Sequence, residues 1–399
     1  MAAIPRYRTT SAPALLSAGF RPFFLLSAVW SAGAVVLWLL LLDGLTGLPT
    51  AMPPVLWHAH EMVFGYGAAT VAGFLLTAVP NWTGRMPLQG LPLGILVSLW
   101  LAGRLAMLIA GGGALSAAVD LAFPTVFLLA LAREIVAGRN WRNLPVLGAL
   151  GMLLLANLLM HLGTMGSQAL ALTGAHLGVA TLLALITLIG GRIIPSFTRN
   201  WLVKRHPQGL LPAPFGAVDK AALASTVAAL LLWTAAPDML ATAGLLVVAG
   251  CANLVRLFRW RGLATVSEPL LAVLHLGYAW VAVGLVLLGV SRWLPGLPPT
   301  AALHALTVGA IGTMTLAVMA RASLGHTGQA LTAGPGCVAV FALVTMAGVL
   351  RLAAPLDMAA YQVLLILSGL AWSSGFGLFA FLFTPLLAKP RQRQAPTAG

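Results

Sequence analysis

The chain has 399 residues, of which 60% are hydrophobic and only 8% are charged. A soluble domain carries roughly 25% charged residues, so this composition excludes an ordinary water-soluble fold. The net charge of +14 would favour nucleic-acid binding in a soluble protein, but here the Lys and Arg residues lie between long apolar runs. We therefore interpret them as determinants of membrane topology and expect no nucleic-acid partner.

Apolar runs recur along the whole chain, and a transmembrane helix needs about 20 such residues. The sequence predicts an all-α, polytopic membrane protein of about twelve helices, at 23–42, 54–79, 92–112, 115–135, 144–165, 169–191, 217–235, 239–259, 268–291, 301–322, 333–353 and 358–387. The longest polar link runs from Pro195 to Lys220. We expect a cytoplasmic segment at 1–22, one membrane domain at 23–388 and a basic cytoplasmic tail at 389–399.

Basic residues fall in every second link between these helices, which indicates the cytoplasmic side. The inside set is Arg6, Arg8, Arg21, Arg85, Arg133, Arg139, Arg142, Arg192, Arg199, Lys204, Arg205, Lys220, Arg256, Arg259, Arg261, Arg321, Lys389, Arg391 and Arg393. The pattern predicts a multi-pass protein of the inner (plasma) membrane with both termini in the cytoplasm and with membrane lipid as its surroundings.

Three arginines break this pattern, namely Arg104 inside a helix and Arg292 and Arg351 at outer helix ends. Charge within a membrane is costly and usually has a partner. One interpretation is that Arg104 pairs with Asp120, with Glu61 nearby, and braces neighbouring helices. The other is that it binds an anion, such as cofactor carboxylates, near the outer face. Arg292 and Arg351 fit either an anion site or interface anchoring.

Five of the eight histidines map to the outer third of the predicted helices: His58, His60, His161, His176 and His304. A single histidine often only hydrogen-bonds a helix end, but imidazole is also a common ligand of haem iron and copper, and five at one depth favour ligation. Residues two apart on a helix point about 200° apart, so His58 and His60 are expected to serve adjacent sites. The Cys-x-x-Cys-His signature is absent, so any haem is non-covalent.

A weak internal repeat links helices two, six and ten. His60, His176 and His304 each begin a helix that reaches a Thr-containing polar turn 22 or 23 residues later. The repeat suggests three four-helix units around a quasi-threefold axis. Glycines in these helices allow either close packing or room for a flat macrocycle. They are Gly65, Gly67, Gly73, Gly178, Gly190, Gly191, Gly309 and Gly312.

Several motifs resemble those of the NnrS family, and the resemblance covers essentially the whole chain. They begin at Gly19 (GFRPFF), Trp57 (WHAHEM), Ala72 (AGFLLTAVPNWTGR), Gly191 (GRIIPSFTRN), His304 (HALTVGAIGTMT) and Arg321 (RASLGHTG). The resemblance implies a haem- and copper-containing inner-membrane protein of the nitric oxide response in denitrifying and related bacteria, associated with resistance to nitrosative stress. The plan also resembles, distantly, the twelve-helix core of the haem–copper oxidases.

These observations lead to the prediction of a protein that binds, detoxifies or senses nitric oxide near the periplasmic face. The expected haem ligands are His60 and His304; the expected ligands of copper or a second haem are His58, His161 and His176. The candidates for haem propionates are Arg104, Arg292 and Arg351. Any turnover would take electrons from quinol or a redox partner. The alternatives are a twelve-helix secondary transporter and a non-catalytic factor for metal delivery or assembly.

Overall fold

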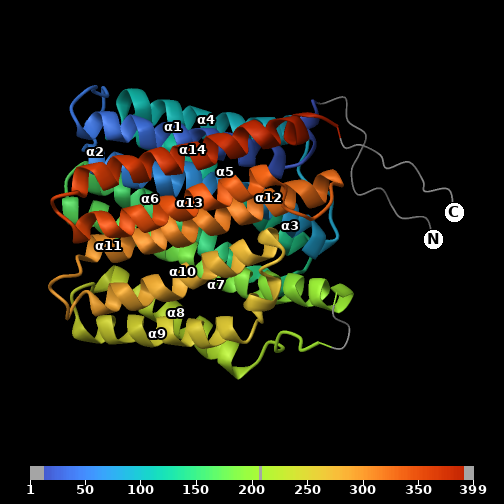
Figure 1. Ribbon diagram of the computed structural model, residues 1–399. Coiled ribbons are helices and arrows are strands. Elements are labelled where there is room, and N and C mark those ends of the chain that lie inside the picture. The colour runs from blue at the N-terminus through green and yellow to red at the C-terminus, as the bar shows by residue number, and fades with distance from the viewer. Residues whose placement is uncertain (1–12, 206–208, 391–399) are drawn as a thin grey trace. The chain divides into compact units, whose positions relative to one another are not determined.

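The computed structural model describes residues 13–205 and 209–390, which form helices and no strand (Figure 1). The predicted inside positions Arg6, Arg8, Arg391 and Arg393 lie outside these ranges. Within them, twelve helical segments are long and apolar enough to cross a membrane, which confirms the predicted number. The elements are η1 Ala14–Ser17, α1 Phe20–Leu42, α2 Pro54–His60, η2 Glu61–Gly67, α3 Ala68–Thr83, α4 Leu91–Ala110, α5 Ala114–Ala137, η3 Trp141–Asn143, α6 Leu144–Thr164, α7 Gln168–Arg205, α8 Ala217–Ala235, α9 Leu240–Phe258, η4 Gly262–Thr265, α10 Pro269–Val290, α11 Pro299–His304, η5 Ala305–Gly312, α12 Thr313–Thr327, α13 Pro335–Ala353, η6 Ala354–Leu356 and α14 Tyr361–Ala388.

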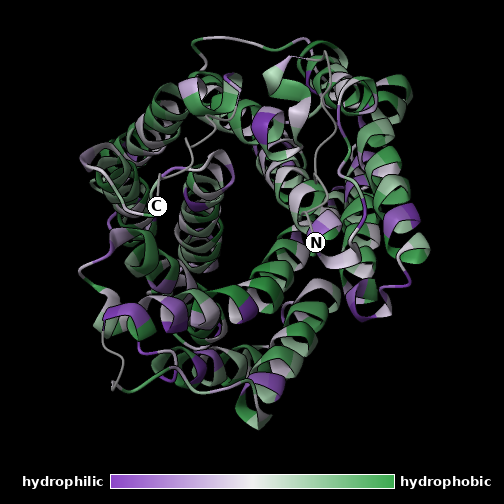
Figure 2. Ribbon diagram, turned by 90° about the vertical axis from the view of Figure 1, so that its right-hand side faces the viewer, coloured by the Kyte–Doolittle hydropathy of each residue, from purple (hydrophilic) through white to green (hydrophobic). Residues whose placement is uncertain are grey.

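Hydrophobic residues cover most of the helical ribbon in Figure 2. Many of them are large and exposed, such as Leu105, Leu129 and Phe381. Apolar side chains on the outside of a helix bundle need lipid around them, since water would make their exposure unfavourable. The chain is therefore a multi-pass membrane protein.

The described helices divide into two compact units. Among the described residues, unit 1 comprises 13–178, 319–331 and 379–390, and unit 2 comprises 179–205, 209–318 and 332–378. Within unit 1, α5 packs against both α4 and α6, and α1 packs against α3 and η2. Within unit 2, α9 packs against α8 and α10, and η5 packs against α10 and α13. The expected single membrane domain and the threefold arrangement of four-helix units stay predictions.

The sixth span is longer than predicted, because α7 continues to Arg205 instead of ending near residue 191. Its extension carries Ile194, Thr198 and Leu202 at intervals of four residues, and all three side chains are buried. This spacing forms one buried face of a helix. The packing of that face outweighs the hydrogen bond that Pro195 removes from the helix.

Two spans contain a π-helical segment that the sequence analysis does not predict. Segment η2 starts directly after His60, and segment η5 starts directly after His304. Such segments are rare and occur frequently at functional sites. The shared position supports the predicted likeness of the second and tenth spans, whereas the third member of the repeat, His176, lies in continuous α-helix.

The GFRPFF motif fixes the last span to the first within unit 1. The buried guanidinium of Arg21 donates through Nη1 to the carbonyl oxygens of Leu387, at 2.8 Å, and Lys389, at 2.6 Å. These carbonyls lie at the end of α14, where the backbone acceptors have no partner within the helix. Arg21 therefore acts as a C-terminal cap of α14.

Candidate metal centre

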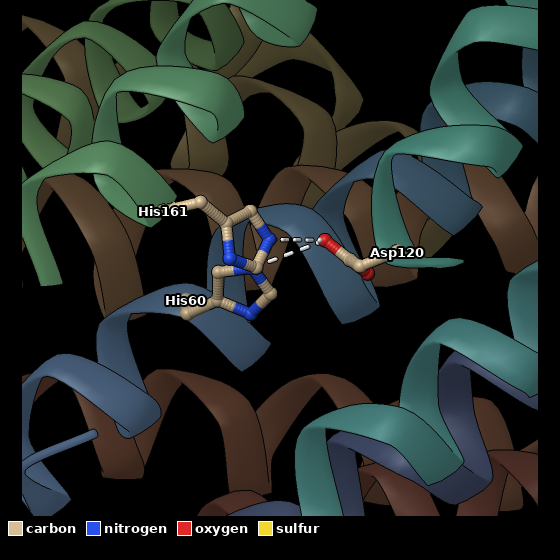
Figure 3. A group of neighbouring side chains, drawn as sticks. All are labelled: His60, Asp120 and His161. Carbon is tan, nitrogen blue, oxygen red and sulfur yellow. Dashed lines mark hydrogen bonds and ion pairs between the residues drawn. The ribbon is translucent and has the colours of Figure 1, made fainter. Parts of the chain in front are cut away.

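Three side chains of unit 1 meet in a buried cluster: His60 at the end of α2, Asp120 in α5 and His161 in α6 (Figure 3). One ligand atom from each residue lies within 4.8 Å of the others. The Nε2 atoms of His60 and His161 approach the same oxygen of Asp120, Oδ2, at 3.2 Å and 3.0 Å. The three residues are the only group of this kind in the described ranges.

Both ring nitrogens of His60 face hydrogen-bond acceptors. Nδ1 lies 2.9 Å from Oε1 of Glu61, and Nε2 lies 3.0 Å from Oδ1 of Asn157 in addition to the Asp120 carboxylate. A neutral imidazole carries only one N–H. If Nδ1–H donates to Glu61, Nε2 carries a lone pair and faces the oxygens of Asn157 and Asp120, which also carry lone pairs. Such a contact requires either a second proton on the ring or a cation between these atoms.

Arg104 connects the two carboxylates of the site. Its guanidinium pairs with Glu61 through Nη1 and with Oδ1 of Asp120 through Nη2. Asn157 adds a hydrogen bond from Nδ2 to Oδ2 of Asp120 at 2.8 Å. The predicted Arg104–Asp120 ion pair is present, and Glu61 completes it. Both carboxylates pair with the Arg104 guanidinium, so its charge is already compensated within the protein. These contacts favour the bracing role of Arg104 over a role in binding haem propionates.

The formal charges of this cluster do not cancel when both histidines are neutral. Glu61 and Asp120 each carry one negative charge, whereas Arg104 carries one positive charge, and all three are almost fully buried. Uncompensated charge is costly inside a protein. One additional positive charge at His60 or between the histidines balances the site, whether it is a proton or a singly charged metal ion.

The donor set fits a small metal ion. Two ligand atoms that each lie about 2.0–2.2 Å from one ion are about 3 Å apart, which is the spacing of the Nε2 and Oδ2 atoms here. Glu61 accepts from His60 Nδ1, the usual support for a ligating histidine. Imidazole and carboxylate donors suit copper or zinc.

The other predicted histidines lie outside the cluster. The half-buried ring of His58 stacks on Trp38, with centroids 4.1 Å apart, and His176 is half-buried in α7. His304 belongs to unit 2, where its Nδ1 donates to the carbonyl oxygen of Thr300 at 2.7 Å. His58 and His60 thus have different surroundings, and the expectation that they serve two adjacent sites stays a prediction.

The two remaining arginines differ from each other. Arg292 is exposed at the end of α10 and donates from Nε to the carbonyl oxygen of Asp238 at 3.2 Å. Arg351 is buried near the end of α13, and its Nη1 group has no hydrogen-bond partner among the described residues. A buried guanidinium with an unsatisfied donor suits an anion, so Arg351 is the better candidate for a carboxylate partner.

Glycines at three of the predicted macrocycle positions are covered by side chains. A Cβ atom at Gly309 would lie 2.6 Å from the ring of Trp280, one at Gly178 would lie 2.6 Å from Val63, and one at Gly312 would contact Trp372. These glycines make room for neighbouring side chains. Of the two sequence-based interpretations, close packing is the one that these positions fit.

Unit 2 contains a second buried ion pair, between Arg256 Nε and Asp219 Oδ1 at 2.9 Å. Arg256 Nη1 donates to the Tyr278 hydroxyl at 2.8 Å, and that hydroxyl donates to Asn253 at 2.6 Å. A Cβ atom at Gly191, the first residue of the GRIIPSFTRN motif, would overlap the Arg256 guanidinium. The network contains no histidine, and we interpret it as structural.

Asn157 is the site residue that the sequence analysis missed. It precedes His161 by four residues, so both side chains lie on one face of α6. A polar residue one turn from a predicted ligand, in an otherwise apolar helix, is the signal that would have identified it.

Comparison with known families gives one match. The family model described as "NnrS protein" matches residues 14–391, which is nearly the whole chain. No curated protein matches the chain at a significant level.

Proposed function

Because the chain belongs to the NnrS family, we propose that it is an inner-membrane metalloprotein of the nitric oxide response, with His60, Asp120 and His161 as copper ligands. The observation that carries the proposal is the approach of two imidazole Nε2 atoms to one buried carboxylate oxygen. Membership of the family fits a role in the nitric oxide response, and the buried donor set supplies a place for the metal.

The charge balance of the cluster supports copper in its singly charged state. Glu61, Asp120 and Arg104 leave one negative charge when the histidines are neutral. A singly charged ion neutralises the site, whereas a doubly charged ion leaves an excess of positive charge among buried side chains. Glu61 would orient His60, and Asn157 would hold the Asp120 carboxylate.

A metal at this position would supply the binding chemistry for nitric oxide, since copper and iron both bind this ligand. Nitric oxide is small and apolar enough to enter from the lipid, so the site needs no polar channel. The role of the protein's own residues is to orient the imidazoles, hold the carboxylate and exclude water. His60, Glu61 and His161 are fully buried, which fits this role.

Haem binding is a separate part of the proposal and concerns unit 2. Because Nδ1 of His304 donates to Thr300, His304 would ligate haem iron through Nε2. Arg351 in the same unit offers its buried Nη1 group to a propionate. His60 is less suited to haem, because both of its ring nitrogens already face side chains in a filled interior.

The proposal includes orientation and partners. We place the metal centre near the periplasmic face, the termini and the basic links in the cytoplasm, and nitric oxide as the small ligand. Quinol or a redox protein would supply electrons if the protein turns nitric oxide over.

Copper content of the full chain purified in detergent tests the metal centre. We expect stoichiometric copper in the unchanged protein and loss of copper in His161→Gln. The matched control is His275→Gln, since His275 is also a buried histidine in a membrane helix but belongs to unit 2 and is not a member of the cluster. Full copper in His161→Gln, or equal loss in both variants, would overturn the assignment.

An optical spectrum of the same preparations tests the haem assignment independently. A Soret band in the unchanged protein that is lost in His304→Gln and kept in His161→Gln is the expected result. A preparation with neither haem nor copper would instead favour a transporter. Nitric oxide consumption in the presence of a reductant would distinguish an enzyme from a sensor or a metal-delivery factor.

A further inference from the structure

A cavity of about 770 Å³ lies at the end of unit 1 where α3 and α5 finish and α4 begins. This is the end that carries the basic links and is predicted to face the cytoplasm. Part of its lining is apolar and includes Leu76, Leu88 and Leu131. The volume is within the range of about 300–1,000 Å³ of small-molecule sites.

The polar part of the lining carries a net positive charge. Glu134 lies between two arginines: its Oε2 accepts from Arg85 Nε at 2.5 Å, and its Oε1 accepts from Arg133 Nη2 at 3.0 Å. All three residues line the cavity. Two guanidiniums against one carboxylate leave one positive charge at the wall.

The arginines retain hydrogen-bond donors beyond those that Glu134 uses. A guanidinium has five N–H groups. The hydrogen bonds within the described protein engage only Nε of Arg85, together with Nε and Nη2 of Arg133. The Nη groups of Arg85 are therefore available to a ligand, and guanidinium forks match the geometry of phosphate oxygens.

The segment that carries Arg85 is held in place on both sides. Gly84 ends α3 in the left-handed conformation, with φ 69° and ψ 9°, which turns the chain toward Arg85. Asn140 Nδ2 donates to the carbonyl oxygen of Trp82 at 2.5 Å, and Gln89 Nε2 donates to that of Ser17 at 2.9 Å. These contacts give a role to Gly84 and Arg85 of the sequence motif, which the metal centre does not use.

We propose that this cavity binds an anionic phospholipid, with the phosphate at Arg85 and Arg133 and the upper acyl chains against the leucines. The wall combines charge and apolar surface at the ends of membrane-spanning helices, where lipid head groups lie. A neutral quinol would leave the positive charge uncompensated. Glu134 would not be a free acceptor for a quinol hydroxyl, because it already accepts from two guanidiniums. The proposal is independent of the metal centre.

Native mass spectrometry of the full chain in detergent tests the proposal, with dioleoylphosphatidylglycerol and dioleoylphosphatidylcholine as probes. We expect preferential retention of the anionic lipid and binding about fivefold weaker for each arginine removed, in Arg85→Gln and Arg133→Gln. The control is Arg142→Gln, because Arg142 is an exposed arginine in η3, after α5, that does not line the cavity. An unchanged Tm in detergent and a monodisperse elution profile identify folded variants.

Three outcomes would overturn the proposal. Equal retention of both lipids would remove the role of charge, and equal loss in Arg142→Gln would indicate a general surface effect. Displacement of the anionic lipid by glycerol phosphate or by decylubiquinone at equal concentration would assign the cavity to a free phosphate compound or to a quinone.

The Arg85→Lys variant separates the effect of charge from that of guanidinium geometry. It keeps the positive charge but loses the paired N–H donors of the guanidinium, so it should bind the anionic lipid more weakly than the unchanged protein and more tightly than Arg85→Gln.

Discussion

The imidazole rings of His60 and His161 lie 5.0 Å apart, measured between centroids, with their planes inclined by 66°. The two residues come from different spans, α2 and α6, and the Nε2 atoms of both approach Oδ2 of Asp120 in α5. Two adjacent imidazoles and one carboxylate offer donor atoms that suit a metal ion, which is why we propose this cluster as the copper site.

Replacing Arg104 by glutamine should strongly destabilise the protein. The change leaves Glu61 and Asp120 as buried negative charges without their partner. Removing one member of a buried ion pair costs about 3–5 kcal/mol. Thermal unfolding in detergent should show a large decrease in Tm.

Arg292→Gln is the matched control for that experiment. Arg292 is exposed and makes one hydrogen bond to a backbone carbonyl, so its loss should change Tm little. Similar Tm values for the two variants would mean that the Glu61–Arg104–Asp120 network does not stabilise the fold.

Asp120→Asn should abolish copper binding, whereas Asp219→Asn should leave it intact. Both aspartates are buried and paired with an arginine, so both substitutions should lower Tm. Only Asp120 also faces two histidines. Elemental analysis of the purified variants provides the comparison, and equal copper loss would show that the metal content depends on general stability.

Gly65→Ala should perturb the metal centre through packing alone. A Cβ atom at this position would lie 2.8 Å from Arg104 Nη1, Glu61 Oε2 and Trp30 Nε1. The Arg104 ion pairs would have to shift, so we expect a lower Tm and reduced copper content. Gly33→Ala places a methyl group in open space on α1 and should be neutral or stabilising by up to about 1 kcal/mol. A neutral Gly65→Ala variant would contradict the close contacts of this segment.

Cysteine labelling tests the orientation. In a background with Cys251 and Cys337 replaced by serine, Ser167→Cys lies in the predicted outer link after α6, and Arg142→Cys lies in the predicted inner link before it. A membrane-impermeant maleimide should label Ser167→Cys in intact cells and Arg142→Cys only after permeabilisation. The reverse pattern would invert the proposed topology, and the cysteine-free background serves as the blank.

The number of spans was predictable because bilayer thickness fixes the length of an apolar segment. The extension of α7 to Arg205 was not, since Pro195 and the basic residues after it are typical of a link. What holds those residues in a helix is the burial of Ile194, Thr198 and Leu202, and that depends on tertiary contacts absent from a hydropathy pattern.

The candidate site was predictable in part. His60 and His161 were expected in the same region because both lie at a similar depth in the membrane. Arg104 was expected to pair with Asp120 because an unpaired charge in lipid is costly. Depth alone does not determine on which face of a helix a side chain lies. His58 and His176 were therefore also predicted as metal ligands, although they lie outside the cluster. Asn157 was missed because a neutral amide gives no charge signal.

The π-helical segment η2 determines the direction in which His60 points. A π-helical segment hydrogen-bonds from residue i to i+5 and so accommodates one more residue than regular α-helix. If the same seven residues, 61–67, were wound as regular α-helix, everything before them would turn by about 100° relative to α3, which would take the imidazole away from Asp120. The direction of the His60 ring therefore depends on the wider winding of residues 61–67, and a change that made this segment regular α-helix would leave every side chain of the site present but turned away from its partners.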